Sequence, residues 1–448
     1  MPFLKHDRIT QAQVVILGFL FQILIGACLL SLPVATQSGE RVPFLDALFT
    51  ATSATCVTGL VIHDTALFWS PFGQGVILLL IQVGGMGVVT MAVAIFMFSG
   101  RKIGLKQRWV MQESISAPQV GGIVRMTGFI LKTAFLIEAI GALLLALRFC
   151  PQFGLGKGIW YGIFHAVSAF CNAGFDLMGE TGAFSSLTGY VGDPLVNLVI
   201  CLLIVVGGLG FLTWHDVAAH GRHVSQYRLQ SKLILLTTLA LLVGGFLFFR
   251  FYEFSRPQWA ALTGGERGLA ALFQSVSPRT AGFNTVDLTQ LSACSQLMTI
   301  LLMLAGGSPG STAGGFKTTT LAVLLLSVGA VIRRQGSARC FGRRLPDQVL
   351  RNACAIFLLY LVLFLAGGML ICCMDEIPLM QALFEAASAI GTVGLSLGAT
   401  AEASEASRLI LIFLMYFGRV GGLTMIYAMA AGSNGASSQY PQEQVTVG

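Results

Sequence analysis

The chain alternates between long and short apolar segments, and this alternation occurs four times. Each long segment carries few charges and approaches the roughly 20 residues that a helix needs to cross the hydrocarbon core of a bilayer. Each short segment has about a dozen residues, too few for a crossing. The pattern therefore predicts pairs of helical spans with a half-span inside each pair. The predicted spans are residues 14–34, 75–98, 124–149, 194–214, 232–251, 295–332, 349–373 and 407–430.

A short motif containing glycine follows each half-span, and the four motifs recur at nearly equal intervals along the chain. One such motif alone is more often an ordinary turn. Four copies, each after a half-span, indicate a repeated function. The motif residues are Val57, Thr58 and Gly59; Asn172, Ala173 and Gly174; Thr280, Ala281 and Gly282; and Thr392, Val393 and Gly394.

The repeated unit is therefore span, half-span, loop and span. Because each unit crosses the membrane twice, all four units have the same orientation and can surround one axis. We predict an all-α membrane protein with four parallel span–pore-helix–span repeats around a central pore, similar to a potassium channel. The predicted boundaries are 1–100 for repeat 1, 101–222 for repeat 2, 223–335 for repeat 3 with a broken second span, 336–432 for repeat 4 and 433–448 for a C-terminal tail.

Composition and charge agree with a membrane location. The chain is 55% hydrophobic and only 10% charged, whereas soluble domains carry about 25% charged residues. Basic residues such as Lys106, Arg228 and Arg343 lie between the repeats, and acidic residues lie beside the half-spans. The positive-inside rule then predicts a multi-pass protein with both termini in the cytoplasm. This sidedness explains the net charge of +7 better than binding to nucleic acid does, so no nucleic-acid partner is expected.

The glycine motifs have the chemistry of an ion filter. Backbone that leaves helical geometry at membrane depth must be buried or face a water-filled cavity. Glycine allows carbonyl oxygens to point at an ion, and a ring of carbonyls can replace the hydration shell of K⁺. The half-spans aim their partly negative C-terminal ends at the same place. No motif residue is acidic, which favours coordination by backbone carbonyls.

Residues 305–315, within the second span of the third unit, include five glycines and a proline, which cannot sustain a helix. We therefore predict that this span alone breaks around a flexible loop. A simple kink is the alternative. A nucleotide-binding P-loop is excluded by spacing, because Phe316 separates the glycines from Lys317 and no strand precedes them. The loop residues are Ala305, Gly306, Gly307, Ser308, Pro309, Gly310, Ser311, Thr312, Ala313, Gly314 and Gly315.

Several charged residues remain open in role. Arg419 lies near the middle of the last span, where insertion costs about 2.5–3.5 kcal/mol, so it needs a wet cavity or a partner such as the loop carbonyls. Arg279 and Glu385 either pair with each other or act separately as caps. The aspartates that follow the first three motifs could concentrate cations, although turn or cap formation is the commoner role. They are Asp64, Asp176 and Asp287.

The motifs resemble the four filter sequences of the Trk/Ktr/HKT superfamily of potassium transporters, over residues 10–430. Eight spans without an extra N-terminal pair resemble its KtrB-type members. The resemblance implies K⁺ bound at the motif carbonyls, and a gate formed by the 305–315 loop, Lys317 and Arg419. It also implies a homodimer with one pore per subunit in a bacterial inner (cell) membrane, and a cytoplasmic ring of nucleotide-binding KtrA-type subunits. Na⁺ coupling is left open, and no organic cofactor is expected.

Two other classes of function compete with potassium uptake. A secondary carrier for another small solute or cation would need substrate-sized sites at broken helices, and the sequence indicates one broken span. A membrane enzyme would need a catalytic cluster at the membrane surface, and the sequence contains no such cluster of His, Glu or nucleophiles. We therefore do not expect an enzyme.

Overall fold

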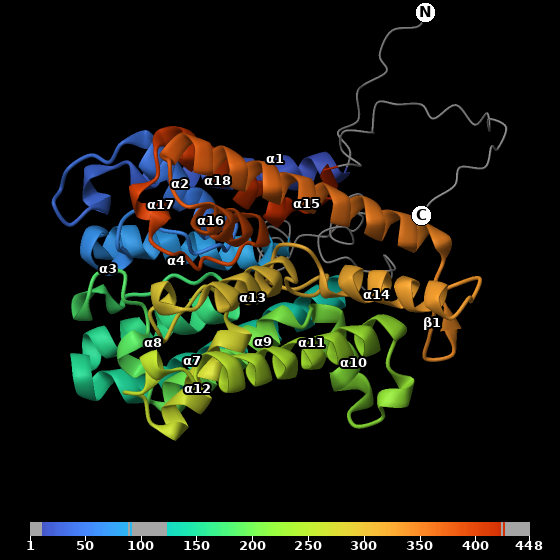
Figure 1. Ribbon diagram of the computed structural model, residues 1–448. Helices are drawn as coiled ribbons and strands as arrows, with labels where there is room; N and C mark the ends of the chain where they lie inside the picture. Colours follow the sequence, from blue (N-terminus) through green and yellow to red (C-terminus); the bar gives the residue numbers. More distant parts are fainter. Residues whose placement is uncertain (1–10, 88–89, 92–122, 423, 426–448) are drawn as a thin grey trace, which may run out of the picture.

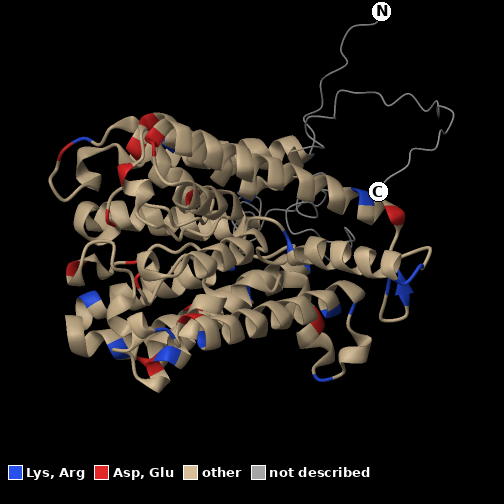
Figure 2. Ribbon diagram, in the orientation of Figure 1, with Lys and Arg blue, Asp and Glu red and all other residues tan. Residues whose placement is uncertain are grey.

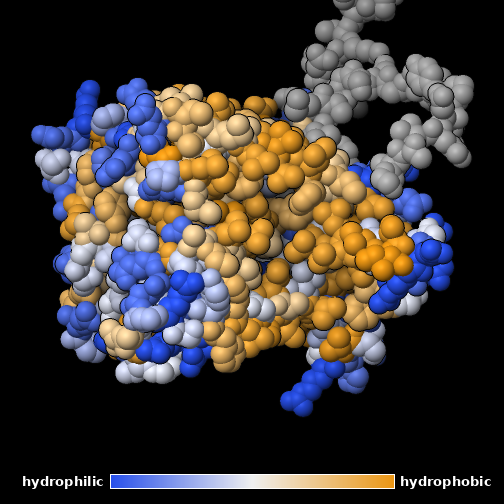
Figure 3. Space-filling model, in the orientation of Figure 1, coloured by the Kyte–Doolittle hydropathy of each residue, from blue (hydrophilic) through white to orange (hydrophobic). Residues whose placement is uncertain are grey.

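Residues 11–87, 90–91, 123–422 and 424–425 are described by a computed structural model of the chain. Four of its helices are long and apolar enough to cross a membrane, or five if the bent pair α9–α10 is one span. Figure 3 shows a hydrophobic belt between two hydrophilic ends, as a membrane protein requires. The four long helices are α1 (Gln11–Leu30), α7 (Ile123–Phe153), α11 (Leu229–Phe248), which the π-helical turn Phe249–Glu253 continues, and α15 (Asp347–Asp375).

The four predicted half-spans are helices, and each ends with at most three residues left before its glycine motif begins. The third begins with a capping box, in which Thr263 and Glu266 satisfy each other's backbone N–H groups. The first has Asp46 in its first turn, where a carboxylate favours the positive end of the helix dipole. These helices are α2 (Phe44–Thr55), α8 (Leu155–Phe170), α12 (Gly264–Val276) and α16 (Leu379–Gly391).

The second spans start at well-defined caps, but none of them is one continuous helix over its whole predicted length. In α4 and α9 a proline occupies the first turn, preceded by Ser70 and Asp193, whose side chains accept backbone N–H groups. The helices of the second spans are α4 (Pro71–Met86), α9 (Pro194–Gly208) with α10 (Phe211–His220), α13 (Ala293–Leu304) with α14 (Thr318–Ile332), and α18 (Glu405–Val420). The prediction of eight crossings stays a prediction.

The prediction that only the third unit has a broken span is wrong. Helices α9 and α10 meet at 97°, within the stretch 194–214 that was predicted as one span. Gly210 at this junction has φ +87°, a left-handed conformation that interrupts a helix. Helices α4 and α18 end in the same way at Gly87 and Gly421, with φ of +86° and +89°.

The second span of each unit packs against the half-span of another, so that the units form a closed cycle. Helix α4 contacts α8, α9 contacts α12, α13 contacts α16, and α18 contacts α2. Within the units, α2 packs on α1 and α4, and α16 packs on α15 and α18. Figure 1 shows the long helices running side by side along one direction.

The remaining elements lie at the two ends of this bundle. Figure 2 shows acidic residues gathered at the end that carries α3 (Thr65–Phe68), and a basic cluster at the hairpin of the opposite end. That hairpin contains the only strands in the described residues, β1 (Arg339–Cys340) and β2 (Arg343–Arg344). The other short elements are η1 (Pro33–Ala35), η2 (Met178–Thr181), η3 (Thr188–Tyr190), η4 (Val224–Gln226), η6 (Pro257–Trp259), η7 (Leu288–Gln290) and α17 (Ala399–Glu402).

Some predictions concern residues outside the described part. These are the far end of the span 75–98, the boundary between repeats 1 and 2 with Lys106, the two termini and the tail 433–448. The repeat boundaries therefore stay predictions.

Candidate functional site

The four motif glycines, Gly59, Gly174, Gly282 and Gly394, form a closed ring that we call the glycine ring. A Cβ atom added to Gly59 would lie 3.0 Å from Cα of Gly174, and one on Gly174 would lie 2.9 Å from Cα of Gly282. The corresponding distances are 3.3 Å from Gly282 to Gly394 and 2.9 Å from Gly394 back to Gly59. Each glycine therefore abuts the next in chain order, with no room for a side chain.

Backbone oxygen atoms stand beside every glycine of the ring. In each case the atom nearest to an added Cβ is the carbonyl oxygen of the residue that precedes the neighbouring glycine. The added atom on Gly174, for example, would lie 2.8 Å from the oxygen of Ala281. The four oxygens belong to Ala173, Ala281, Val393 and Thr58.

The motif backbones share an unusual conformation. The glycines have φ between +69° and +95°. The first residue of each motif also has a positive φ, although three of the four are β-branched and strongly disfavour this region. Such strain persists where surrounding structure enforces it, typically at functional sites. The values are +51° for Val57, +57° for Asn172, +74° for Thr280 and +50° for Thr392.

A serine from the end of each half-span braces its motif. The N–H of Gly59 donates to Oγ of Ser53 over 3.1 Å, and the N–H of Gly394 donates to Oγ of Ser388 over 3.0 Å. In the other two motifs a serine donates to the carbonyl that follows the glycine, and these serines are Ser168 and Ser277. Sequence reasoning missed this role of the half-span serines.

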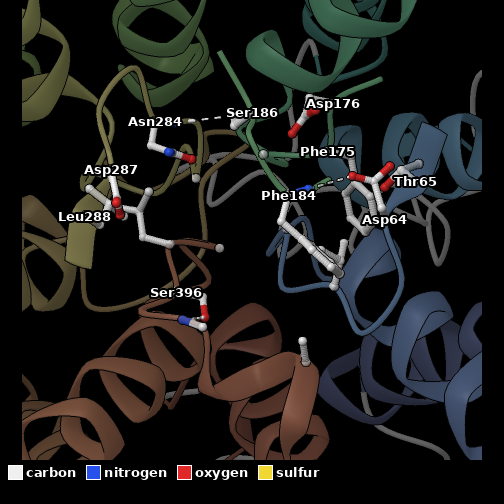
Figure 4. A pocket seen from close by; sticks show the side chains of 18 of the residues that line it. Asp64, Thr65, Phe175, Asp176, Phe184, Ser186, Asn284, Asp287, Leu288 and Ser396 are labelled. Carbon is white, nitrogen blue, oxygen red and sulfur yellow. Dashed lines mark hydrogen bonds between the residues drawn. The ribbon is translucent and has the colours of Figure 1, made fainter. Parts of the chain in front are cut away.

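A cavity of about 230 Å³ opens on one side of the glycine ring. Figure 4 shows Asp64, Asp176 and Asp287 on three different segments around it. The expected turn or cap role is confirmed for all three: Asp64 accepts from the N–H of Ala66 at 2.9 Å, Asp176 from that of Met178 at 3.0 Å, and Asp287 from that of Thr289 at 3.0 Å. Burial raises the pKa of Asp176 to about 6, so this carboxyl titrates near neutrality.

The predicted loop of the third unit, 305–315, separates α13 from α14 on the other side of the ring. Its backbone N–H groups bond to the broken ends of two other second spans. Ser308 N donates to the carbonyl of Gly208 over 3.0 Å, and Gly315 N donates to that of Gly418 over 3.0 Å. The loop is therefore an ordered element anchored to α9 and α18.

Thr312 connects this loop to the second motif. Its Oγ1 donates to the carbonyl oxygen of Phe170 over 3.0 Å and accepts from Nδ2 of Asn172 over 3.1 Å. A Cβ added to Gly314 would lie 3.0 Å from Cβ of Thr392, so the loop also touches the fourth motif. The 305–315 loop thus lies directly against the motif residues.

Arg419 bridges three elements. Its Nη2 donates to the carbonyl oxygen of Gly85 over 2.9 Å and also to that of Gly84, at the end of α4. Its Nη1 donates to the carbonyl of Thr312 in the loop. The ring of Phe19 lies 5.8 Å from the guanidinium carbon. Sequence reasoning foresaw loop carbonyls as partners but not the α4 carbonyls.

Lys317 and Arg419 line a second cavity, of about 320 Å³, on the loop side of the ring. The ammonium group of Lys317 donates to the carbonyl oxygens of Ala313 at 2.8 Å and Gly314 at 3.1 Å. Lys317 and Arg419 therefore both donate to carbonyl groups of the loop.

Arg279 and Glu385 do not pair. The carboxylate of Glu385 accepts from Oγ of Ser396 at 2.7 Å and from the N–H of Leu397 at 2.9 Å. It also accepts from Thr400 at 2.5 Å, so it organises the chain after the fourth motif. Arg279 is buried without an acidic partner in the described part of the chain.

A second set of glycines was missed in the sequence. Each lies three residues before the glycine at which a second span ends, and each presses against the C-terminal end of a half-span. A Cβ on Gly207 would lie 3.1 Å from the carbonyl carbon of Phe170. The signal is the pattern G-x-x-G in three second spans, and the missed residues are Gly84, Gly207 and Gly418.

Comparison with known proteins identifies the class. The family model described as "TrkH: Cation transport protein" matches residues 10–440. With its apolar helices, the protein is therefore a membrane transport protein and not an enzyme. The chain belongs to the TrkH family of cation transport proteins.

Three relatives match over nearly their whole length. The chain is 39% identical to the potassium/sodium uptake protein NtpJ of Enterococcus hirae, over 99% of this chain and 98% of that protein. It is 40% identical to the Ktr system potassium uptake protein B of Bacillus subtilis, with the same coverage. The Ktr system potassium uptake protein B of Vibrio alginolyticus is 36% identical, over 100% of this chain and 98% of that protein.

A solved structure supports the fold. The crystal structure of the potassium transporter TrkH from Vibrio parahaemolyticus matches with a TM-score of 0.73 and 19% sequence identity. The match covers 96% of this chain and 86% of that chain. The two proteins therefore share a fold.

Proposed function

We propose that this protein is a potassium uptake transporter whose ion path runs through the glycine ring. The observation that carries the proposal is the closure of that ring, in which every glycine meets a backbone carbonyl of the next motif. Carbonyl oxygens in this arrangement replace the hydration shell of K⁺. The four half-spans add the partly negative ends of their dipoles. The names of the relatives from E. hirae and B. subtilis support K⁺ as the ion, and the former adds Na⁺ as a second candidate.

The gate in this proposal is the 305–315 loop with Lys317 and Arg419. The loop is bonded to the ends of α9 and α18 and touches two motifs. Both cations line the cavity on the loop side of the ring. A fixed positive charge in a narrow site of low dielectric constant repels K⁺ strongly. Until the loop moves, the ion path is therefore blocked by the loop itself and by the positive charges of Lys317 and Arg419.

The proposal includes the membrane and the partners that the sequence predicts. The protein would lie in a bacterial inner membrane with both termini in the cytoplasm, as a homodimer with one pore per subunit. The exposed arginines of the hairpin, Arg339, Arg343 and Arg344, give the basic end a surface for an acidic partner. The Ktr system names of two relatives support a KtrA-type ring as that partner.

A secondary carrier remains the alternative to test. The sequence argument against it relied on a single broken span, and α9–α10 is a second one. The carrier would bind a solute in the cavity beside Lys317, whereas the potassium transporter binds its ion within the glycine ring. Uptake of rubidium without any solute separates the two.

The proposal is tested by uptake of radioactive rubidium into proteoliposomes. KCl should compete with rubidium far more strongly than NaCl does. Gly59→Ser should lower this preference by about tenfold, because the new side chain meets the backbone of Gly174 and displaces the carbonyls. Gly189→Ser is the matched control, since a side chain there meets open space. Absence of rubidium uptake, or an unchanged preference in Gly59→Ser, would contradict the proposal.

A further inference from the structure

The broken ends of three second spans present carbonyl groups toward the same layer beneath the glycine ring. Each set of carbonyls has a donor from outside its own helix. At α9 and α18 the donors are loop amides, Ser308 N to Gly208 and Gly315 N to Gly418. At α4 the donor is instead a cation, the guanidinium of Arg419. Among these three helix ends, the α4 end is thus the one whose carbonyls bond to a positive charge.

The guanidinium of Arg419 is bound there by the kinds of group that bind a monovalent metal cation. Its acceptors are the carbonyl oxygens of Gly84, Gly85 and Thr312. None of the ion pairs among the described residues includes Arg419. Phe19 covers the guanidinium with the face of an aromatic ring. Carbonyls, a helix C-terminal end and an aromatic face all favour a monovalent cation without a counter-charge.

Two glycines bring the α4 carbonyls into this position. A Cβ on Gly84 would lie 2.8 Å from the carbonyl carbon of Thr55, so only glycine lets α4 approach the half-span this closely. A Cβ on Gly85 would lie 2.7 Å from Sγ of Cys171. Gly87 then ends the helix with φ +86°, and its N–H donates to the carbonyl oxygen of Gly84 over 3.2 Å, beside the guanidinium of Arg419.

We infer that the carbonyls of Gly84 and Gly85, completed by Thr312, form a second cation site beneath the glycine ring. Its occupant in this structure is the guanidinium of Arg419. The inference rests on the proposed function for its role: when the loop and Arg419 withdraw, the α4 carbonyls face the ion path and bind a monovalent cation. Arg419 is then a competitor for that site as well as a barrier.

Free guanidinium tests the site in the full-length chain carrying Arg419→Ala. It should fill the vacant position and slow rubidium flux through Arg419→Ala at about tenfold lower concentration than it slows the parent. Urea has the same shape without charge, and tetramethylammonium has charge without N–H donors. Neither should act selectively. Lys317→Ala is the matched variant, because it removes a cation from the same cavity but not from the α4 carbonyls.

Thermal unfolding gives a readout that does not depend on transport. Low millimolar guanidinium, far below denaturing concentrations, should raise the melting temperature of Arg419→Ala but not of the parent or Lys317→Ala, because a ligand of the folded state stabilises it. KCl should reduce this shift by competition, and choline chloride should not. If Arg419→Ala does not fold, Arg419→Gln is measured in the same way.

The outcomes separate the site from the proposed function. Loss of rubidium flux in every variant, with a guanidinium-dependent rise in melting temperature for Arg419→Ala, would contradict the transport role and support the site. Flux that guanidinium slows equally in the parent and Arg419→Ala, together with no selective rise in melting temperature, would overturn the site and leave the transporter proposal standing.

Discussion

The glycine ring and the layer on its loop side, formed by the ends of the second spans and the 305–315 loop, are built from the same four units. The four units have the same conformation only in the ring. In the ring, all four motifs have positive φ at the first residue and at the glycine. In the layer beneath, three second spans break at a single glycine, whereas the third unit contributes the 305–315 loop. The backbone of the glycine ring therefore has nearly fourfold symmetry, whereas the layer beneath it does not.

This difference follows from what each layer has to contact. An ion on the axis needs equivalent carbonyls from every unit, so a departure in one motif would distort the whole ring. Beneath the ring, three equivalent helix ends leave a common space, and one divergent segment can fill it. The loop occupies that space by bonding to α9 and α18, and Arg419 closes the remaining side at α4.

The contact between the half-span end and the layer beneath the ring should be broken by a substitution at one glycine and kept by the same substitution at its neighbour. A Cβ on Gly207 would press on the carbonyl of Phe170 and lie 3.0 Å from Oγ1 of Thr312, whereas one on Gly208 would lie 3.6 Å from Asn172. Gly207→Ala should therefore destabilise the fold by about 1–3 kcal/mol. Gly208→Ala should be neutral or stabilising by up to about 1 kcal/mol, as alanine favours helix.

Thermal unfolding of the two purified variants in detergent measures this difference. Equal melting temperatures for Gly207→Ala and Gly208→Ala would show that the close approach of α9 to α8 is unimportant.

The attachment of the loop to the ring can be weakened at Thr312. Thr312→Val keeps the shape but leaves the carbonyl of Phe170 and the amide of Asn172 without their hydroxyl partner, at a cost of about 1–3 kcal/mol to the docked loop. Rubidium flux without a regulatory partner should rise by about tenfold. Thr319→Val is the control, because Thr319 lines the cavity beside Lys317 and Arg419 without a side-chain hydrogen bond in the described residues. Equal flux in both variants would indicate that Thr312 does not hold the loop closed.

The smallest expected effect is on the pH dependence of uptake and concerns the cavity that contains Asp176, on the side of the ring away from the 305–315 loop. With a pKa raised by burial to about 6, Asp176 is a carboxylate at a pH of about 7.5 and neutral at about 5. Cation attraction into the cavity should therefore weaken as the pH falls, and low-salt uptake should drop by about twofold. Asp176→Asn should remove this pH dependence.

Asp287→Asn provides the comparison. Against the effect of burial, hydrogen bonds from Thr289 lower the pKa of Asp287, so its charge persists over the same pH range. Its removal should reduce uptake at both pH values and keep the pH dependence. A pH profile of Asp176→Asn identical to that of the parent would exclude this role for Asp176.

The sequence predicts the helices better than their interruptions. The last long helix was predicted at 349–373 and spans Asp347–Asp375. The breaks at Gly87, Gly210 and Gly421 were missed, because one glycine inside an apolar run costs only about 1 kcal/mol and does not by itself end a helix. Only the contact with the half-span beside it makes each break necessary.

The motif positions were predictable, but their conformation and partners were not. A positive φ at Val57 contradicts the preference of a β-branched residue and is imposed by the surrounding fold. The partners of Glu385 lie after the fourth motif at Ser396 and Thr400, which no charge pattern indicates. Functions that depend on the type of side chain could be predicted from the sequence. Functions that depend on backbone carbonyls were indicated in the sequence only by the glycines.

The position of a bound ion tests the central claim most directly. Crystals of the purified protein grown in rubidium chloride give anomalous difference density for the ion alone. The account predicts a peak on the axis of the glycine ring, at similar distances from the carbonyl oxygens of Thr58, Ala173, Ala281 and Val393. An ordered structure with no peak there, and a peak instead at side chains of either cavity, would contradict selection by backbone carbonyls.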